Sequence, residues 1–178
     1  MDDGRNIILI GYRASGKTTI GKQLAEELWK KFIDVDDETC KRFGGKTIAQ
    51  IWEESGEPAW RREEAAVTQE LVARKGLIIG LGGGTLMQPE ARKAVEEAAN
   101  AVRIYFKCHP DELYRRISED KKSAATRPNL TRHAGSIEEI KEMLALREPV
   151  YEAVADVVFD VTHVTPDSAL RYVIKRCL

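Results

Sequence analysis

The chain has 178 residues, enough for one domain with a substantial core, and its 28 basic and 29 acidic residues leave a net charge of −1. This balance gives no basic footprint for nucleic acid, and no apolar run approaches the roughly 20 residues of a membrane span. Three scattered cysteines and three scattered histidines show no zinc spacing. We therefore expect a single cytoplasmic domain over residues 1–178 that acts as a monomer, without nucleic acid or membrane as a partner.

Five short apolar runs predict strands at residues 6–10, 32–34, 76–81, 101–107 and 156–161. The first, third and fifth runs are nearly continuous in apolar residues, which is typical of strands covered on both faces. Helical patterns lie between them. The alternation predicts an α/β domain with three layers, in which ligands bind beyond the carboxyl ends of parallel strands.

Two features mark where the predicted helices begin and end. Thr47 with Gln50 fits a capping box at a helix start. Pro149 sits late in the pattern of residues 136–152, where its missing N–H is expected to kink or end that helix.

A complete phosphate-binding loop follows the first predicted strand. Residues 11–18 fit G-x-x-x-x-G-K-[ST] and lead into a helical pattern, which is the context that the motif requires. The loop's N–H groups and the start of the helix can face phosphates. Lys17 can reach the β- and γ-phosphates, and the Thr18 hydroxyl can bind Mg²⁺. A plain glycine turn is the alternative, but motif and context agree on a nucleoside triphosphate, first of all ATP.

Two carboxylates follow the second predicted strand. Asp34 and Asp36 are two residues apart, and in an extended chain such side chains point to the same side. We expect one to lie near Mg²⁺ and the other to accept a proton from an acceptor hydroxyl. The alternative is that both acids only favour a helix start, as expected for Asp37 and Glu38.

Arginine and glycine motifs follow further along the chain. Arg61 and Glu64 share a helix face, so Glu64 can orient the Arg61 guanidinium toward a carboxylate. The spacing alone favours an ordinary exposed pair. Residues 82–84 are three glycines after the third strand, and they favour close approach of a ligand over a flexible turn.

Residues 119–135 are polar, strongly charged and poor in apolar side chains. Long loops of this kind are often lids, and a mobile lid excludes water from phosphoryl transfer. Arg127 can swing from it onto the phosphoryl group, whereas a solvated surface loop is the alternative. Arg147 lies late in a helix, where a cation complements the dipole, so by itself it is assigned a structural role.

In this order, the motifs resemble the shikimate kinase family from about residue 6 to residue 175. The matching residues are Gly11 to Thr18, Asp34 and Asp36, Trp60-Arg61-Arg62 with Glu64, Leu81 to Gly84, Arg127-Pro128, and Arg147 with Pro149 and Tyr151. The resemblance implies a P-loop fold like that of nucleoside monophosphate kinases, with a five-stranded parallel sheet in the order 2-3-1-4-5 and a mobile lid. It also implies MgATP-dependent phosphorylation of the 3-hydroxyl of shikimate, on the way to chorismate and the aromatic amino acids.

The resemblance assigns roles residue by residue. Its catalytic residues are Lys17, Asp36 and Arg127, and Asp36 either acts as a base or only positions the hydroxyl. The ATP-binding residues are Gly11, Ala14, Ser15, Gly16, Lys17, Thr18, Thr19, Arg116 and Arg127. Thr18 and, through water, Asp34 bind Mg²⁺. Shikimate is bound by Asp36, Arg61, Gly82, Gly83, Gly84 and Arg147, with Glu64 orienting Arg61.

Two other functions stay open on the sequence. A different small-molecule kinase of similar fold, such as a gluconate kinase, shares the phosphate loop but lacks this combination of motifs. A non-catalytic ATP-binding regulatory module is disfavoured by the intact set of Lys17, Thr18, Asp34, Asp36 and Arg127. Turnover on a chosen acceptor separates the three functions.

Overall fold

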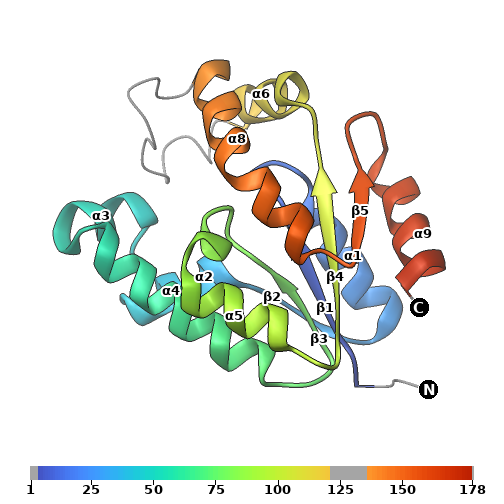
Figure 1. Ribbon diagram of the computed structural model, residues 1–178, viewed down its shortest axis with the longest axis horizontal. Helices are drawn as coiled ribbons and strands as arrows, with labels where there is room; N and C mark the ends of the chain where they lie inside the picture. Colours follow the sequence, from blue (N-terminus) through green and yellow to red (C-terminus); the bar gives the residue numbers. More distant parts are fainter. Residues whose placement is uncertain (1–3, 121–135, 178) are drawn as a thin grey trace.

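The computed structural model describes residues 4–120 and 136–177 and contains one parallel sheet (Figure 1). Its strands pair in the order β2-β3-β1-β4-β5, which confirms the predicted order. Each lies within one residue of its predicted ends: β1 Asn6–Ile10, β2 Lys31–Asp34, β3 Leu77–Gly80, β4 Ala101–Lys107 and β5 Val157–Asp160. All four pairings are parallel, so the carboxyl ends of the strands meet at one edge of the sheet.

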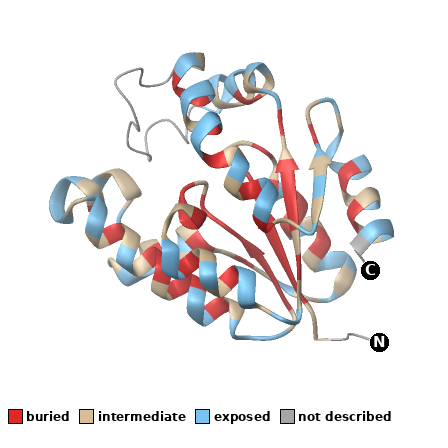
Figure 2. Ribbon diagram, viewed as in Figure 1, coloured by how far each residue is buried: buried red, intermediate tan, exposed pale blue. Residues whose placement is uncertain are grey.

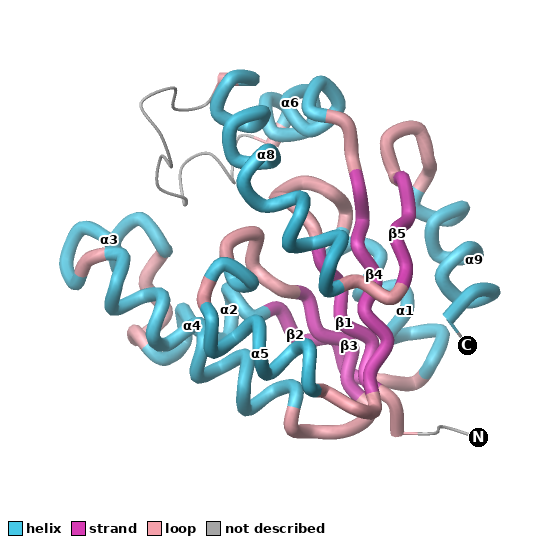
Figure 3. The backbone as a smooth tube through the Cα atoms, in the orientation of Figure 1, coloured by secondary structure: helices cyan, strands magenta, loops and turns pink. Residues whose placement is uncertain are grey.

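Helices cover both faces of the sheet and complete the three layers (Figure 3). Helices α1 and α9 pack on one face, and α4, α5 and α8 pack on the other. The described helices are α1 Lys17–Leu28, α2 Val35–Arg42, α3 Ile48–Ser55, α4 Glu57–Val72, α5 Pro89–Glu97, α6 Pro110–Glu119, α8 Ile137–Val154 and α9 Pro166–Cys177, with a 3₁₀ turn, η1, at Thr85–Met87. In the described ranges no helix is long and apolar enough to cross a membrane.

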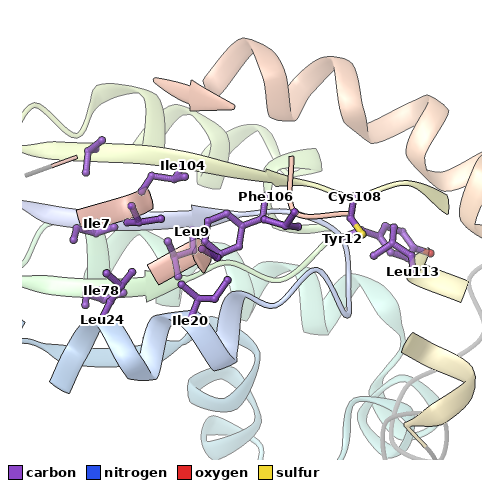
Figure 4. Packing of buried hydrophobic residues seen from close by; sticks show 14 of the residues in the cluster. Ile7, Leu9, Tyr12, Ile20, Leu24, Ile78, Ile104, Phe106, Cys108 and Leu113 are labelled. Atoms are coloured by element: carbon purple, nitrogen blue, oxygen red, sulfur yellow. The ribbon is translucent and has the colours of Figure 1, made fainter. Parts of the chain in front are cut away.

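The central strand β1 is buried on both faces, which explains its continuous apolar run (Figure 2). Ile7 and Leu9 belong to the core beneath α1 and α9, and Ile8 and Ile10 belong to the opposite core beneath α4 and α8. Figure 4 shows the first of these cores. Burying one such side chain stabilises the fold by about 1.5–3 kcal/mol, so β1 is a firm anchor. The phosphate-binding loop begins immediately after Ile10.

The helix boundaries confirm one sequence prediction and correct another. Thr47 and Gln50 form the predicted capping box of α3. Of the two alternatives for Pro149, a kink or an end of the helix, the end is wrong, because α8 continues to Val154. An interior proline costs roughly 3 kcal/mol, and the burial of Tyr151 and Val154 beyond it offsets that cost.

Candidate active site

Two adjoining pockets lie at the carboxyl ends of the strands. The larger is a cleft of about 820 Å³ between the phosphate-binding loop, α6 and residues 161–166. The smaller pocket, of about 60 Å³, lies between the same loop, α3, α4 and α8. Helix α3, which carries one wall of the smaller pocket, projects from the body of the molecule beside α4 (Figure 1).

The backbone conformation of the phosphate-binding loop depends on its glycines and on hydrogen bonds from its own lysine. Gly11 has φ 153° and Gly16 has φ 98°, and a Cβ at Gly11 would lie only 2.7 Å from Ser15 Oγ. Helix α1 begins at Lys17, so its N-terminal end faces the larger cleft. Lys17 Nζ is buried and donates hydrogen bonds of 2.8 Å to the carbonyl oxygens of Gly11 and Tyr12. The loop and helix start therefore present a positive concave surface suited to phosphates.

Asp34 connects the sheet to the cleft in two ways. It is the N-cap of α2, since its Oδ1 accepts hydrogen bonds from Asp36 N at 3.0 Å and Asp37 N at 3.5 Å. Its Oδ2 accepts a hydrogen bond from Thr18 Oγ1 at 3.1 Å. The expectation that Asp34 and Asp36 lie in one extended segment is wrong, because Asp36 is in the first turn of α2. Both residues nevertheless line the larger cleft, so the helix-start and site interpretations hold together.

The oxygen atoms of Thr18 and Asp34 fit a hydrated Mg²⁺. Mg²⁺ keeps several waters and is usually held by one or two protein oxygens together with substrate phosphates. A hydroxyl and a carboxylate within 3.1 Å of each other at the phosphate-binding loop provide that donor set. Among the described residues there is no group of three or more histidine, cysteine or acidic side chains that would bind a metal alone.

Arg61 and Glu64 form a buried pair in the smaller pocket, contrary to the exposed pair that their spacing favours. The Glu64 side chain is 1% exposed and that of Arg61 is 14% exposed. Arg61 Nη1 donates to Glu64 Oε2 at 2.9 Å, and Glu64 Oε1 accepts from Thr85 Oγ1 at 2.6 Å. Burial lowers the pKa of Arg61, but Glu64 and Glu57 raise that pKa by more, so the guanidinium stays charged. The Trp52 ring covers it, 5.5 Å from Arg61 Cζ.

Arg147 also lies in the smaller pocket, although its position in the sequence gave it only a structural role. It is 8% exposed, and its Cζ lies 5.8 Å from the centre of the Tyr12 ring. Tyr151 lies one turn further along α8 and donates its hydroxyl hydrogen bond to the Gly83 carbonyl oxygen. Burial raises the pKa of Tyr151 to about 12, so this donor keeps its proton at neutral pH.

The three glycines after β3 leave room for side chains of the site that lie close to their backbone. A Cβ at Gly82 would collide with Asp36 Oδ1, and one at Gly84 would lie 2.5 Å from Arg61 Nη1. At Gly83 the nearest atom would be Arg147 Nη1, at 3.4 Å. The glycine segment therefore allows Asp36, Arg61 and Arg147 to gather around one small pocket.

Arg116 joins the phosphate-binding loop to the far wall of the larger cleft. It donates to the carbonyl oxygens of Ala14 at 3.3 Å and Val161 at 3.0 Å, and its Nε donates to Glu112 at 2.7 Å. Hydrogen bonds from Arg115 and Arg116 lower the pKa of Glu112 to about 2. With residues 162–166, Arg116 lines the region where the base of a nucleotide is expected.

The structure describes most, but not all, of the site residues that the sequence predicts. Of the predicted ATP-binding residues of the loop, Gly11 does not line the larger cleft, whereas the others do: Ala14, Ser15, Gly16, Lys17, Thr18 and Thr19. Arg127 lies outside the described residues. Sequence reasoning gave no role to Trp52, Tyr12 or Arg13, which all line the smaller pocket. The only signal that the sequence offers for Arg13 is its place inside the phosphate-loop motif. That signal is weak, because the motif accepts any residue type at this position.

The chain is similar to known proteins both in its sequence and in its fold. A family model described as shikimate kinase matches residues 13–178. A shikimate kinase from Dechloromonas aromatica is 34% identical, over 97% of this chain and 90% of the relative. Another from Pelotomaculum thermopropionicum is 37% identical, over 96% and 94% of the two chains.

Two solved structures are informative. A shikimate kinase from Acinetobacter baumannii, in complex with shikimate, is 27% identical with a TM-score of 0.86, over 98% of this chain and 93% of that one. A gluconokinase from Sinorhizobium meliloti is 18% identical with a TM-score of 0.59, over 96% and 90% of the chains, which is a likeness of fold alone.

Proposed function

This chain belongs to the shikimate kinase family, and we propose that its two pockets transfer the γ-phosphoryl group of ATP to the 3-hydroxyl of shikimate. The bond between the γ-phosphorus and the bridging oxygen breaks, and a bond to the shikimate oxygen forms. The products are ADP and shikimate 3-phosphate, and the hydroxyl proton is released.

One observation carries the proposal most directly. Asp36 borders both pockets, with the phosphate-binding loop on one side and the buried Arg61–Glu64 pair on the other. Shikimate is a carboxylate with three hydroxyl groups. The planar forks of Arg61 and Arg147 suit its carboxylate, and Asp36 suits an acceptor hydroxyl.

The roles of the remaining residues follow from their positions. Lys17 and the start of α1 bind the β- and γ-phosphates, and Arg116 lies beside the nucleotide base. Thr18 and Asp34 would hold Mg²⁺, which neutralises phosphate charge when bound. Asp36 accepts the hydrogen bond of the acceptor hydroxyl and takes its proton. Arg127 is assigned to the phosphoryl group on the sequence motif alone.

Formation of ADP by the purified protein with Mg²⁺ and ATP tests this function, with shikimate or gluconate as acceptor. We expect turnover with shikimate only. Turnover with gluconate only would refute the acceptor assignment, and ATP binding without turnover on either would indicate the regulatory module. Lys17→Ala should abolish most turnover without unfolding the chain, because the phosphate contacts of its side chain are lost.

A matched pair of arginine variants tests the carboxylate assignment. Arg61→Ala removes a charged contact worth about 1.5–3 kcal/mol, which corresponds to a rise in KM for shikimate of roughly 10- to 100-fold. The control is Arg62→Ala, because Arg62 is exposed and lies outside both pockets. Equal KM values for the two variants would return Arg61 to a purely structural role.

A further inference from the structure

Arg13 occupies a place that the family motif does not specify. It is the third residue of the phosphate-binding loop, and its side chain is partly buried. Of the residues that the structure describes, only Arg13, Asp36 and Gly83 border both the larger cleft and the smaller pocket. A Cβ at Gly83 would lie 3.7 Å from Arg13 N, so the Arg13 backbone stands against the glycine wall where the two pockets meet.

The guanidinium of Arg13 has no acidic partner within residues 4–120 and 136–177. Its Nε is buried and makes no hydrogen bond there, and no described carboxylate forms an ion pair with it. Its neighbour is the Tyr12 ring, whose centre lies 6.0 Å from Arg13 Cζ. Burial raises the pKa of Tyr12, so its phenol carries no charge at neutral pH.

The other arginines of the two pockets are arranged differently. Arg61 is matched by Glu64 and Glu57, and Arg116 by Glu112. Arg147 lines only the smaller of the two pockets, and its Cζ lies 5.8 Å from the centre of the Tyr12 ring. A partly buried cation without an acidic partner is costly, so the arrangement of Arg13 points to an anionic ligand.

The charge of the expected ligands decides which anion this is. A shikimate carboxylate carries one negative charge, and it can be met by Arg61 and Arg147. The phosphoryl group carries several charged oxygens and must pass between the pockets, through the region that Arg13 borders. Of the two pockets, Lys17 lines the larger cleft alone, whereas Arg13 borders both.

We propose that Arg13 binds the phosphoryl group at the junction of the two pockets during its transfer, and that it holds the same group in the phosphorylated product. This inference rests on the proposed function. A guanidinium fork contributes here because charge on the phosphoryl oxygens is shared during transfer and can be met by two parallel N–H groups.

Steady-state kinetics of Arg13→Gln test the proposal, with Arg13→Lys as the charge-conserving variant and Arg62→Gln as the exposed control. Removing a group that stabilises charge in the transition state typically lowers kcat by about 10²- to 10³-fold. We expect that loss in Arg13→Gln, with KM for shikimate changed by less than about threefold, and a partial recovery in Arg13→Lys. A rise in KM for shikimate with kcat unchanged would overturn the proposal in favour of a third carboxylate contact.

Binding measured by calorimetry gives a second, independent readout. Arg13→Gln should weaken binding of shikimate 3-phosphate by at least about tenfold and leave binding of shikimate nearly unchanged, since only the product carries the phosphoryl group. Equal affinities of wild type and variant for the product would overturn the proposal. If Arg13→Gln does not fold, Arg13→Lys carries the same comparison. Wild-type protein without shikimate turnover would refute the proposed function, whereas full turnover in Arg13→Gln refutes only this inference.

Discussion

Replacing Gly82 with alanine should impair catalysis through a single added methyl group. Gly82 follows β3, and its φ lies outside the left-handed region, so alanine meets no backbone strain there. The new Cβ would lie 2.7 Å from Glu64 Oε1, where ordinary contact begins at 3.4 Å, and it would collide with Asp36 Oδ1. One or both carboxylates must therefore move by more than half an ångström.

The size of the effect follows from what holds those carboxylates. Glu64 is held by Arg61 and Thr85, and a Cβ at residue 82 would lie nearer to Asp36 Oδ1 than to Glu64, so Asp36, which borders both pockets, takes the larger displacement. A misplacement of about 1 Å at a reacting group can cost about 10²-fold in rate, or about 2.7 kcal/mol of activation free energy. Overpacking of the buried site should also lower the free energy of unfolding by about 1–3 kcal/mol.

Gly83→Ala is the matched control for this prediction. Its Cβ would lie nearest to the end of the Arg147 side chain, at 3.4 Å, and that side chain can shift. Arg13 N at 3.7 Å and Gly11 O at 3.8 Å would be at ordinary contact distances. Coupled ADP formation at saturating shikimate gives kcat for both variants, and urea titration gives their stability. We expect about a 100-fold loss of kcat in Gly82→Ala and less than about fivefold in Gly83→Ala. The reasoning fails if kcat of Gly82→Ala stays within about threefold of wild type, or if both variants lose the same amount.

Three further predictions concern other parts of the structure. Gly84→Ala places a methyl group 2.5 Å from Arg61 Nη1, so KM for shikimate should rise by more than kcat falls; a pure kcat effect would contradict the carboxylate assignment. Asn6→Ala removes three side-chain hydrogen bonds, of 2.6, 2.9 and 3.4 Å, to the backbone from the end of α4 to the start of β3, so urea titration should show a loss of about 1–3 kcal/mol with kcat unchanged. Glu112 has a pKa lowered from 4.5 to about 2 by its arginine partners, so its stabilising contribution is present above pH 4.5 and lost as the pH falls toward 2. The difference in unfolding free energy between wild type and Glu112→Gln should shrink across that range, and a constant difference would count against the ion pairs.

The sequence predicts the strand positions well because each strand has a local apolar signature. The expectation that the fifth run is covered on both faces is wrong, because β5 lies at the edge of the sheet with Val158 and Asp160 exposed. The runs around Ile8, Ile79 and Phe106 are apolar and short, and such runs between helical patterns belong to a buried parallel sheet. The order of the strands came from the family resemblance, and the structure confirms it. Pro149 shows the limit of local rules, since burial of residues beyond it keeps α8 intact.

The burial of the arginines could not be predicted from spacing. A pair three residues apart on a helix has the same sequence pattern whether water or protein covers it. Arg61 and Glu64 are buried because η1 contributes Thr85 and α3 contributes Trp52, and both elements are distant in sequence from the phosphate-binding loop that they face. The same holds for Arg147, which only the packing of α8 brings to the Tyr12 ring.

Asp34 explains why the position of a site can be predicted even where its local geometry is predicted incorrectly. A helix that starts directly after a parallel strand needs an acceptor for its first N–H groups, and a carboxylate meets that need. The same place lies at the carboxyl edge of the sheet, where ligands of such folds bind. The helix-start and site interpretations of Asp34 are compatible, because each carboxylate oxygen has its own partner. Oδ1 caps α2, and Oδ2 accepts the hydrogen bond of Thr18 at the phosphate-binding loop. Folding therefore fixes the orientation of the carboxylate, and this orientation suits the role in holding Mg²⁺ that we propose for Asp34 and Thr18.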